Sequence, residues 1–223
     1  MPVTVFPTSS ASTDNTTFGD LKGELARSIN PDDPTVLAIA GDSIISALKV
    51  YARWNWPWDI VEQTITISSG TDTYPLAQKF KLPVAAYLLD GSSRNDKRMG
   101  YIPYQAYLES ASTNQDGQPH LYTIPNAFES NTVLFYPRPS SAYTARIHYY
   151  RMTAFRFRDD NAPIEMPDYA EEALRTWAWY EMLKRLGGAA NLSKLPSARA
   201  DAMAARAELV AMVNSRGDML GVV

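Results

Sequence analysis

The apolar residues of this chain change their spacing twice. Helical spacing marks residues 17–58 and 163–215, whereas much of residues 59–162 has the period of two that is typical of strands. Strands enclosed in this way by helices predict an α+β protein, a bundle of about four helices with an inserted small antiparallel β domain. Residues 1–16 are expected to form a flexible N-terminal arm, and residues 216–223 a C-terminal docking tail.

Local signals predict where the first two helices begin. Thr17 and Asp20 have the spacing of a capping box, in which each side chain satisfies a free amide group of the first turn. Asp33 is a good N-cap for the second helix, and Pro34 suits the first helical position.

The last two helices are predicted from their apolar faces. The third, which ends at Gly187-Gly188, has a core face that includes Trp177, whereas Met182 lies off this face. The fourth is rich in alanine and runs from about Leu195 to Asn214, and Gly217 is expected to end it.

The strand region combines alternation with many prolines. The inward residues of the two clearest strands are predicted to be Ile65 and Ile67, and then Tyr143, Ala145, Ile147 and Tyr149. Prolines through the region would interrupt long hydrogen-bonded ladders, which favours a small sheet or sandwich with short edge strands.

Composition excludes several classes of protein. The 223 residues include no cysteine, so disulfides, thiolate chemistry and cysteine zinc sites are excluded. A net charge of −3 argues against a free-standing, sequence-specific DNA-binding protein, although a channel that passes DNA needs no net attraction to phosphates. The N-terminus does not resemble a signal peptide, and no apolar stretch is expected to approach the roughly 20 residues that span a bilayer.

No set of catalytic residues is visible in the sequence. His148 is expected to face solvent from a strand, and His120 to shape a turn. The chain contains no nucleophile elbow, zinc-protease motif or phosphate-binding loop. Asp159-Asp160-Asn161 offers oxygen ligands for a cation, but a calcium loop normally offers more of them. We therefore expect no enzyme activity, cofactor or metal.

Two clusters of side chains remain as candidates for binding. Trp54, Trp56 and Trp58 are interpreted as fillers of a seam between the helices and the β domain, with an aromatic platform for sugars or bases as the alternative.

Arg151, Arg156 and Arg158 form a basic stretch, interpreted as part of an interface or channel wall. The alternative is that these arginines face phosphate groups.

The order of several short motifs resembles the head-to-tail adaptor (connector) proteins of tailed bacteriophages, especially short-tailed ones. The motifs are Trp54–Trp58, Gly70–Leu76, Gly117-Gln118-Pro119 before Leu121-Tyr122, Val133–Pro139, and Pro163–Pro167 leading into a helix. The resemblance covers residues 17–215. It implies a structural virion protein at the head–tail junction, assembled in the host cytoplasm.

The resemblance also implies partners. Such a protein forms a homo-oligomeric ring, commonly a dodecamer, that joins the portal protein to a tail or nozzle protein. The ring lines the genome-exit channel, contacts genomic DNA transiently and non-specifically, and has no membrane partner. A carbohydrate-binding β module of a virion or secreted protein is the alternative function.

The C-terminal tail is the predicted portal-docking segment. It carries Met219, Leu220, Val222 and Val223, which are costly to leave in water. The alternative is that the tail folds back on its own helices.

Overall fold

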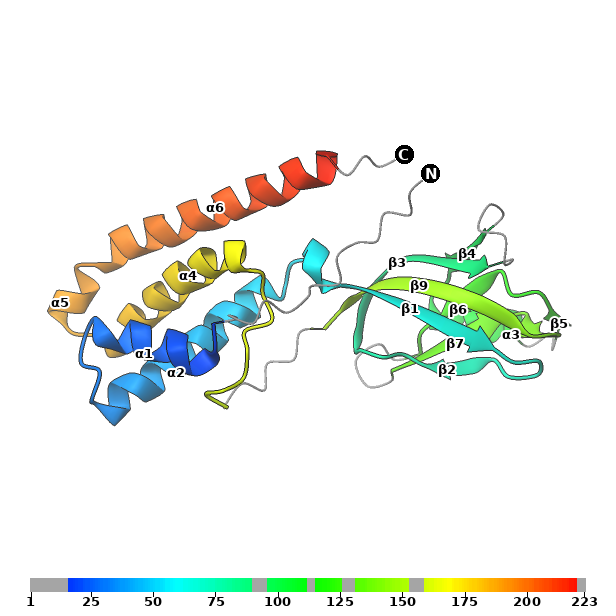
Figure 1. Cartoon of the computed structure of the whole chain (residues 1–223), viewed down its shortest axis with the longest axis horizontal. Helices are drawn as coiled ribbons and strands as arrows, with labels where there is room; N and C mark the ends of the chain where they lie inside the picture. Colours follow the sequence, from blue (N-terminus) through cyan, green and yellow to red (C-terminus); the bar gives the residue numbers. More distant parts are fainter. Residues whose placement is uncertain (1–15, 90–95, 112–114, 126–130, 153–158, 220–223) are drawn as a thin grey trace. The chain divides into compact units, whose positions relative to one another are not determined.

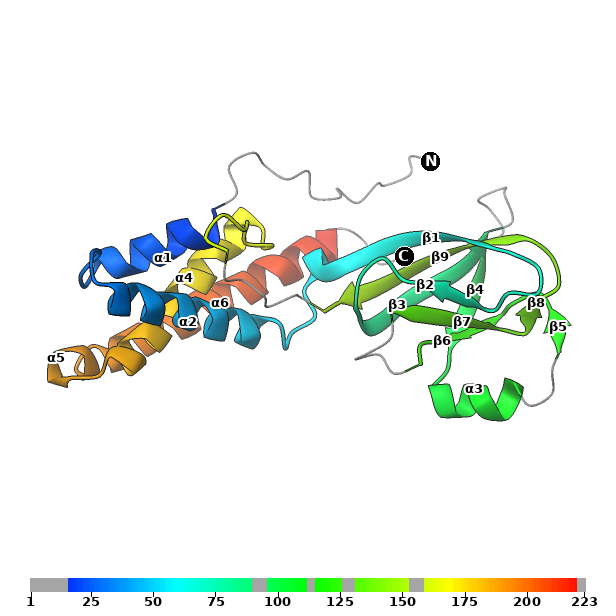
Figure 2. The same cartoon turned by 90° about the horizontal axis from the view of Figure 1, so that it is seen from below.

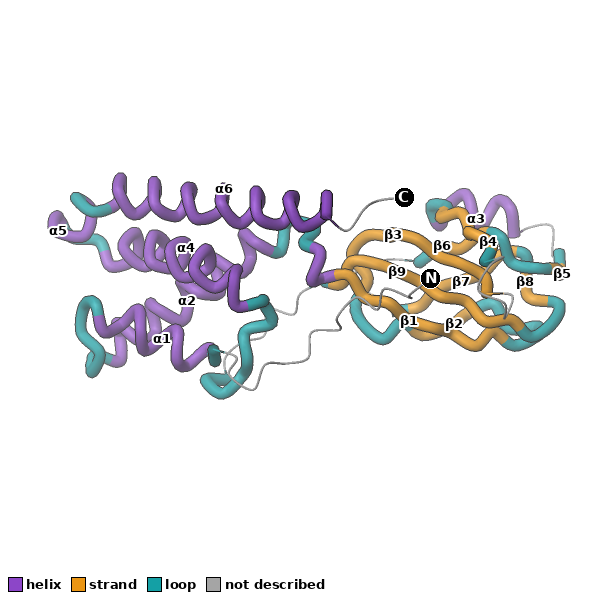
Figure 3. Tube along the Cα trace, turned by 45° about the horizontal axis from the view of Figure 1, so that its top comes forward, coloured by secondary structure: helices purple, strands orange, loops and turns teal. Residues whose placement is uncertain are grey.

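The computed structural model describes residues 16–89, 96–111, 115–125, 131–152 and 159–219 (Figure 1). The chain divides into two compact units. The helical unit comprises Met1–Trp54 with Ala154–Val223, and the β unit comprises Asn55–Thr153. Helices dominate the first unit and strands the second (Figure 3), so the predicted α+β class is confirmed.

Among the described residues, the helical unit contains five helices rather than the four predicted. They are α1 (Phe18–Arg27), α2 (Pro34–Tyr51), α4 (Asp168–Leu186), α5 (Ala189–Leu192) and α6 (Leu195–Met219). The additional helix, α5, is a single turn between α4 and α6.

The predicted start signals of α1 and α2 are confirmed. The Thr17 hydroxyl accepts a hydrogen bond from the Asp20 N–H, and the Thr17 N–H donates to the Asp20 carboxylate, both at 3.1 Å. The Asp33 carboxylate accepts from the Thr35 N–H at 2.7 Å. Both caps satisfy amide groups that have no partner inside the helix.

The chain that returns from the β unit closes the N-terminal end of α1 (Figure 2). The Phe18 N–H donates to the Ala162 carbonyl at 2.9 Å, and the Gly19 N–H donates to the Asp160 carbonyl at 2.8 Å. Lys22 forms an ion pair with the Asp160 carboxylate. The approach at Gly19 is so close that an added Cβ would lie 2.7 Å from the Asp160 carbonyl oxygen.

α4 packs against both α2 and α6. Its buried residues are Ala170, Ala173, Leu174, Ala178, Met182 and Leu183. The predicted face therefore needs correction, because Met182 is fully buried and Trp177 is only half-buried. A helix with neighbours on two sides buries a wider arc than the single stripe that the sequence pattern indicated.

α6 packs on α4 through small residues, as the alanine pattern predicted. Ala198, Ala202 and Leu209 are buried along this contact. The predicted stop at Gly217 is wrong, because the helix continues through this residue to Met219. A glycine inside a helix costs only about 1 kcal/mol relative to alanine, so it need not end the helix. The predicted tail thus begins with helical residues.

The expectation that no apolar stretch approaches the length that spans a bilayer needs correction for α2. It has 18 residues and a mean hydropathy of 1.2, which by length and composition alone would allow it to cross a membrane. Its buried residues, however, include Ala40, Ile44 and Leu48, and it packs on α1 and α4. A helix at the centre of a bundle passes the same test, so this property is weak evidence for a membrane.

The β unit begins with a single 3₁₀ turn, η1 (Pro57–Asp59). Its described strands are β1 (Ile60–Ile67), β2 (Thr73–Pro75), β3 (Phe80–Leu89), β4 (Lys97–Tyr101), β5 (Asp116–Gly117), β6 (Leu121–Thr123), β7 (Thr132–Tyr136), β8 (Arg138–Pro139) and β9 (Tyr143–Arg151). One helix, α3 (Tyr104–Ala111), follows β4.

Seven of these strands form one sheet in the order β1-β9-β3-β4-β6-β7-β2. The Gln63 side chain joins the two outer strands: it donates to the Pro75 carbonyl at 3.1 Å and accepts from the Ala77 N–H at 2.8 Å. The sheet therefore curls until β1 and β2 meet. β4 and β6 pair in parallel, as do β5 and β8. The predicted small antiparallel domain is thus corrected to a larger, mixed and nearly closed sheet.

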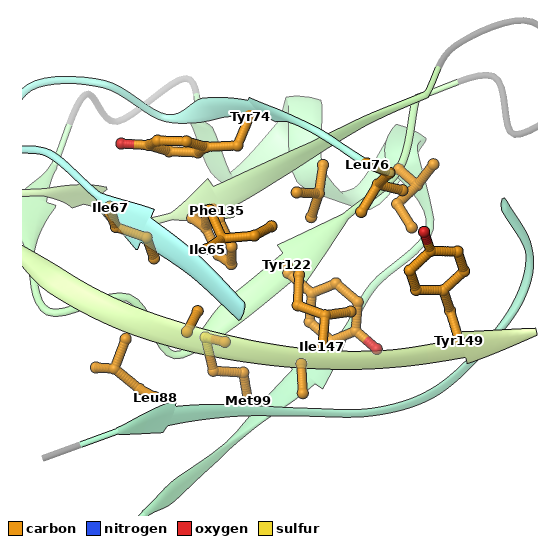
Figure 4. Close-up of a cluster of buried hydrophobic side chains, with 14 of the residues drawn as sticks. Ile65, Ile67, Tyr74, Leu76, Leu88, Met99, Tyr122, Phe135, Ile147 and Tyr149 are labelled. Atoms are coloured by element: carbon orange, nitrogen blue, oxygen red, sulfur yellow. The ribbon is translucent and has the colours of Figure 1, made fainter. Parts of the chain in front are cut away.

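The curled sheet encloses the core of the β unit (Figure 4). The predicted alternation is confirmed, since Ile65 and Ile67 of β1 and Ala145, Ile147 and Tyr149 of β9 are buried. These residues share one face because β1 and β9 pair in antiparallel register, with Ile65 opposite Ala145.

Candidate interaction surfaces

The two histidines take part in strand packing. His148 lies on the outward side of β9 opposite Glu62, as predicted, but it is half-buried, and the two side chains are 3.8 Å apart. Burial lowers the pKa of His148, although the Glu62 carboxylate acts to raise it. The backbone of His120 bonds Tyr136 and Gly100 on either side. Within the described ranges, no three His, Asp or Glu side chains are grouped so that they could hold a metal ion.

The acidic segment at residues 159–161 has a structural role. The Asp160 carbonyl and carboxylate both bind α1, as described above. The Asn161 N–H donates to the Asp159 carboxylate at 3.0 Å. These are the contacts of a turn that caps a helix, and they account for the acidic residues without a cation.

The three tryptophans are divided between the two units and differ in exposure. Trp54 belongs to the helical unit and is 44% exposed, whereas Trp56 is 4% exposed and lies in the β unit. Trp56 stacks on Trp58 with ring centroids 4.7 Å apart. The Trp56 ring is too buried to serve as a sugar platform, whereas Trp54 is exposed and Trp58 half-buried, so the carbohydrate-binding alternative stays a prediction. The seam role of the three residues stays a prediction.

A cation–π cluster, which the sequence pattern did not reveal, covers the exposed Trp54. The Arg206 guanidinium of α6 lies 4.2 Å from the centroid of the Trp54 ring and 5.9 Å from that of Trp177. Trp177 also meets Tyr51 edge to face, and the Tyr51 hydroxyl donates to the Ala173 carbonyl at 2.9 Å. Burial raises the pKa of Tyr51 to about 12. The cluster ties α2, α4 and α6 together.

Of the three predicted arginines, only Arg151 lies in the described part of the chain. Its Nε is 3.6 Å from a carboxylate oxygen of the buried Asp59. Arg151 therefore pairs with a carboxylate inside the β unit. Arg156 and Arg158 lie outside the described residues, and the interface or channel role of the basic stretch stays a prediction.

The predicted docking tail is described only in part. Met219 is the last residue of α6. Leu220, Val222 and Val223, with the side chain of Met219, lie outside the described residues.

A groove of about 410 Å³ opens where β3 and β4 separate. The two strands pair only from Ala86 opposite Met99 to Leu88 opposite Lys97, and beyond Met99 the chain of β4 pairs with β6 instead. The groove is lined by Pro83, Val84, Ala85, Arg98, Met99, Gly100, Tyr101 and Tyr122. It was missed because its two walls are brought together only by the sheet topology.

A protein-family model described as SU10 adaptor protein matches residues 16–221. The chain belongs to the SU10 adaptor protein family. This match spans every described helix and strand of both units. Membership of the SU10 adaptor family confirms the resemblance to an adaptor-type protein, whereas the short-tailed type is a finer statement that the match does not address. A search of curated proteins gave no match.

Proposed function

We propose that this chain is a structural virion protein of a tailed phage that joins the portal to the tail. The observation that carries the proposal is the match to the SU10 adaptor family over residues 16–221, which includes the helical unit and the β unit together. The histidines and the acidic segment have packing and capping roles, which is consistent with a structural protein rather than an enzyme.

Exposed apolar side chains on α5 and α6 support assembly into a ring. Met203 is 49% exposed, and Leu192 and Met212 are also exposed. Single exposed apolar residues are common. Met203 and Met212 are nine residues apart and so lie on opposite sides of α6, and of the two only Met203 points away from the buried face that Ala198 and Ala202 mark. Met203 therefore suits a contact with a neighbouring subunit. We propose a closed ring of identical subunits, such as a dodecamer, because head-to-tail contacts between copies form a ring when the rotation from one subunit to the next closes.

The proposed ring lines the genome-exit channel at the head–tail junction and assembles in the host cytoplasm. Its partners are the portal protein and a tail or nozzle protein, with no membrane partner. Contact with genomic DNA would be transient, because a net charge of −3 on each chain provides no strong attraction to phosphates.

Mixing the purified chain with assembled portal protein tests the proposal. Mass photometry should show a cyclic complex, and electron microscopy should show the ring on one face of the portal. Met203→Glu should weaken ring formation because it places a charge in the subunit contact, whereas Met203→Leu keeps an apolar side chain and serves as the control. A chain that stays monomeric beside a competent portal contradicts the proposal.

A further inference from the structure

We propose that the groove between β3 and β4 binds an extended, apolar segment of a partner protein that carries a carboxylate. The inference rests on the proposed adaptor function, because an adaptor must bind the proteins that it joins. The segment would add to the open edge of β3, a mode of recognition in which main-chain hydrogen bonds give affinity and side-chain pockets give specificity.

The strand edge in the groove is open on one side. β3 pairs with β9 along its length, but on the β4 side the described ladder begins only at Ala86. Val84 lies at a register irregularity in this open part, and its side chain is exposed. Pro83 has no N–H to offer, and proline at an edge limits indiscriminate strand pairing. The edge is thus available to a short segment only.

The groove offers a preformed apolar surface. Met99 and Tyr122, which are buried members of the core in Figure 4, line it together with the exposed Val84 and Tyr101. Its volume lies in the range of sites that bind small ligands or a few side chains. The aromatic rings of Tyr101 and Tyr122 meet edge to face with centroids 5.4 Å apart, which fixes the wall.

Gly100 helps to keep the two strands apart. A Cβ at this position would lie 3.0 Å from a methyl carbon of Leu121 on β6. The absence of a side chain lets β4 approach β6 closely, and their parallel pairing draws β4 away from β3. The groove is therefore built into the sheet topology.

The charge of the groove selects a carboxylate. Among the described residues of the lining, Arg98 alone is charged, and no described carboxylate forms an ion pair with it. By contrast, Arg146 and Arg151 of the same sheet lie 3.6 Å from Glu62 and Asp59. An exposed guanidinium beside an apolar surface is suited to bind a carboxylate through two parallel hydrogen bonds.

A random dodecapeptide library displayed on yeast, with the full chain as bait, provides the probe. Enriched peptides should alternate apolar residues and carry Asp or Glu, and the best of them is then measured by fluorescence anisotropy. Arg98→Gln should weaken its binding about tenfold or more, since a charged hydrogen bond is lost. Lys97→Gln should change binding less than about twofold, because Lys97 lies outside the groove lining and donates to Gln118.

Three outcomes would overturn the inference: no enrichment, enrichment of peptides without acidic residues, or equal binding to the Arg98→Gln and unmodified chains. Val84→Glu provides an independent check, since a carboxylate at the rim should abolish binding of an acidic peptide. Unchanged melting temperatures establish that the variants fold. The peptide assay does not require a ring. If no peptide binds but the chain still assembles on the portal, the groove proposal is wrong and the adaptor function is unaffected. If the peptide binds but the chain does not assemble on the portal, only the adaptor function is contradicted.

Discussion

Residues 159–162 bind the N-terminal end of α1, and this contact leads to opposite predictions for two glycines of that helix. Gly23 has no atom within 4 Å of an added Cβ, whereas at Gly19 the Asp160 carbonyl oxygen would be only 2.7 Å away. Alanine in place of glycine favours a helix by up to about 1 kcal/mol. Gly23→Ala should therefore stabilise the helical unit by about 0.4–1 kcal/mol.

Gly19→Ala should destabilise the same unit. The loop must move, and the Gly19 N–H bond to Asp160 is a backbone contact that cannot rotate away as a side chain would. Loss of this hydrogen bond costs about 0.5–1.5 kcal/mol. Loss of the partly exposed Lys22–Asp160 pair adds about 0–1 kcal/mol. After the helix gain is subtracted, we expect a net loss of about 1 kcal/mol.

Urea denaturation followed by circular dichroism at the helical band measures both variants. The expected result is a higher midpoint for Gly23→Ala and a lower one for Gly19→Ala, with similar slopes. If both substitutions raise the midpoint equally, the loop does not press on α1, and our account of how the returning chain closes this helix is wrong.

Four further predictions concern packing, charge and the tail. Trp177→Ala should lower the stability of the helical unit by about 2–3 kcal/mol, less than a fully buried tryptophan, and a change within error in urea denaturation would contradict its packing role. Arg206→Ala should cost about 0.5–2 kcal/mol through lost cation–π contacts, whereas the exposed Arg199→Ala should be neutral in the same assay. Burial lowers the pKa of His148 in the folded chain. Between this pKa and about 6.5 the unfolded chain therefore binds more protons than the folded chain, so the free energy of unfolding falls as the pH drops through that window. His148→Gln should make the urea midpoint depend less on pH between 7.5 and 5.5. Deleting residues 217–223 should leave the melting temperature unchanged and abolish portal binding, and the reverse result would place the tail on its own core.

Local features of this fold could be predicted from the sequence. The caps at Thr17 and Asp33 depend on residues two or three positions away, and the alternation around Ile147 reports one strand's own two faces. Features that depend on segments distant in the chain could not be predicted in this way. The burial of Met182 reflects a second helix packed against α4, which the periodicity of α4 alone does not reveal.

The interaction surfaces were the least predictable part. In the sequence, Arg206 is one polar residue of an alanine-rich helix, and its position over the Trp54 ring depends on how α6 packs. The tryptophan run reads as one motif, yet Trp54 and Trp56 lie in different units. The groove at Arg98 depends on β4 pairing with β6 in parallel, a long-range choice that no local pattern encodes.

The division into units also sets the order in which the chain can finish folding as it leaves the ribosome. The β unit is one continuous segment, Asn55–Thr153, and all its strands are present once that segment has emerged. α1 and α2 are made first but must wait for α4 and for residues 160–162, whose carbonyls complete α1. At roughly 5–20 residues per second, this wait is on the order of ten seconds. During that time the apolar faces of α1 and α2 lack α4 as a partner, so these faces stay exposed while the β unit is being made.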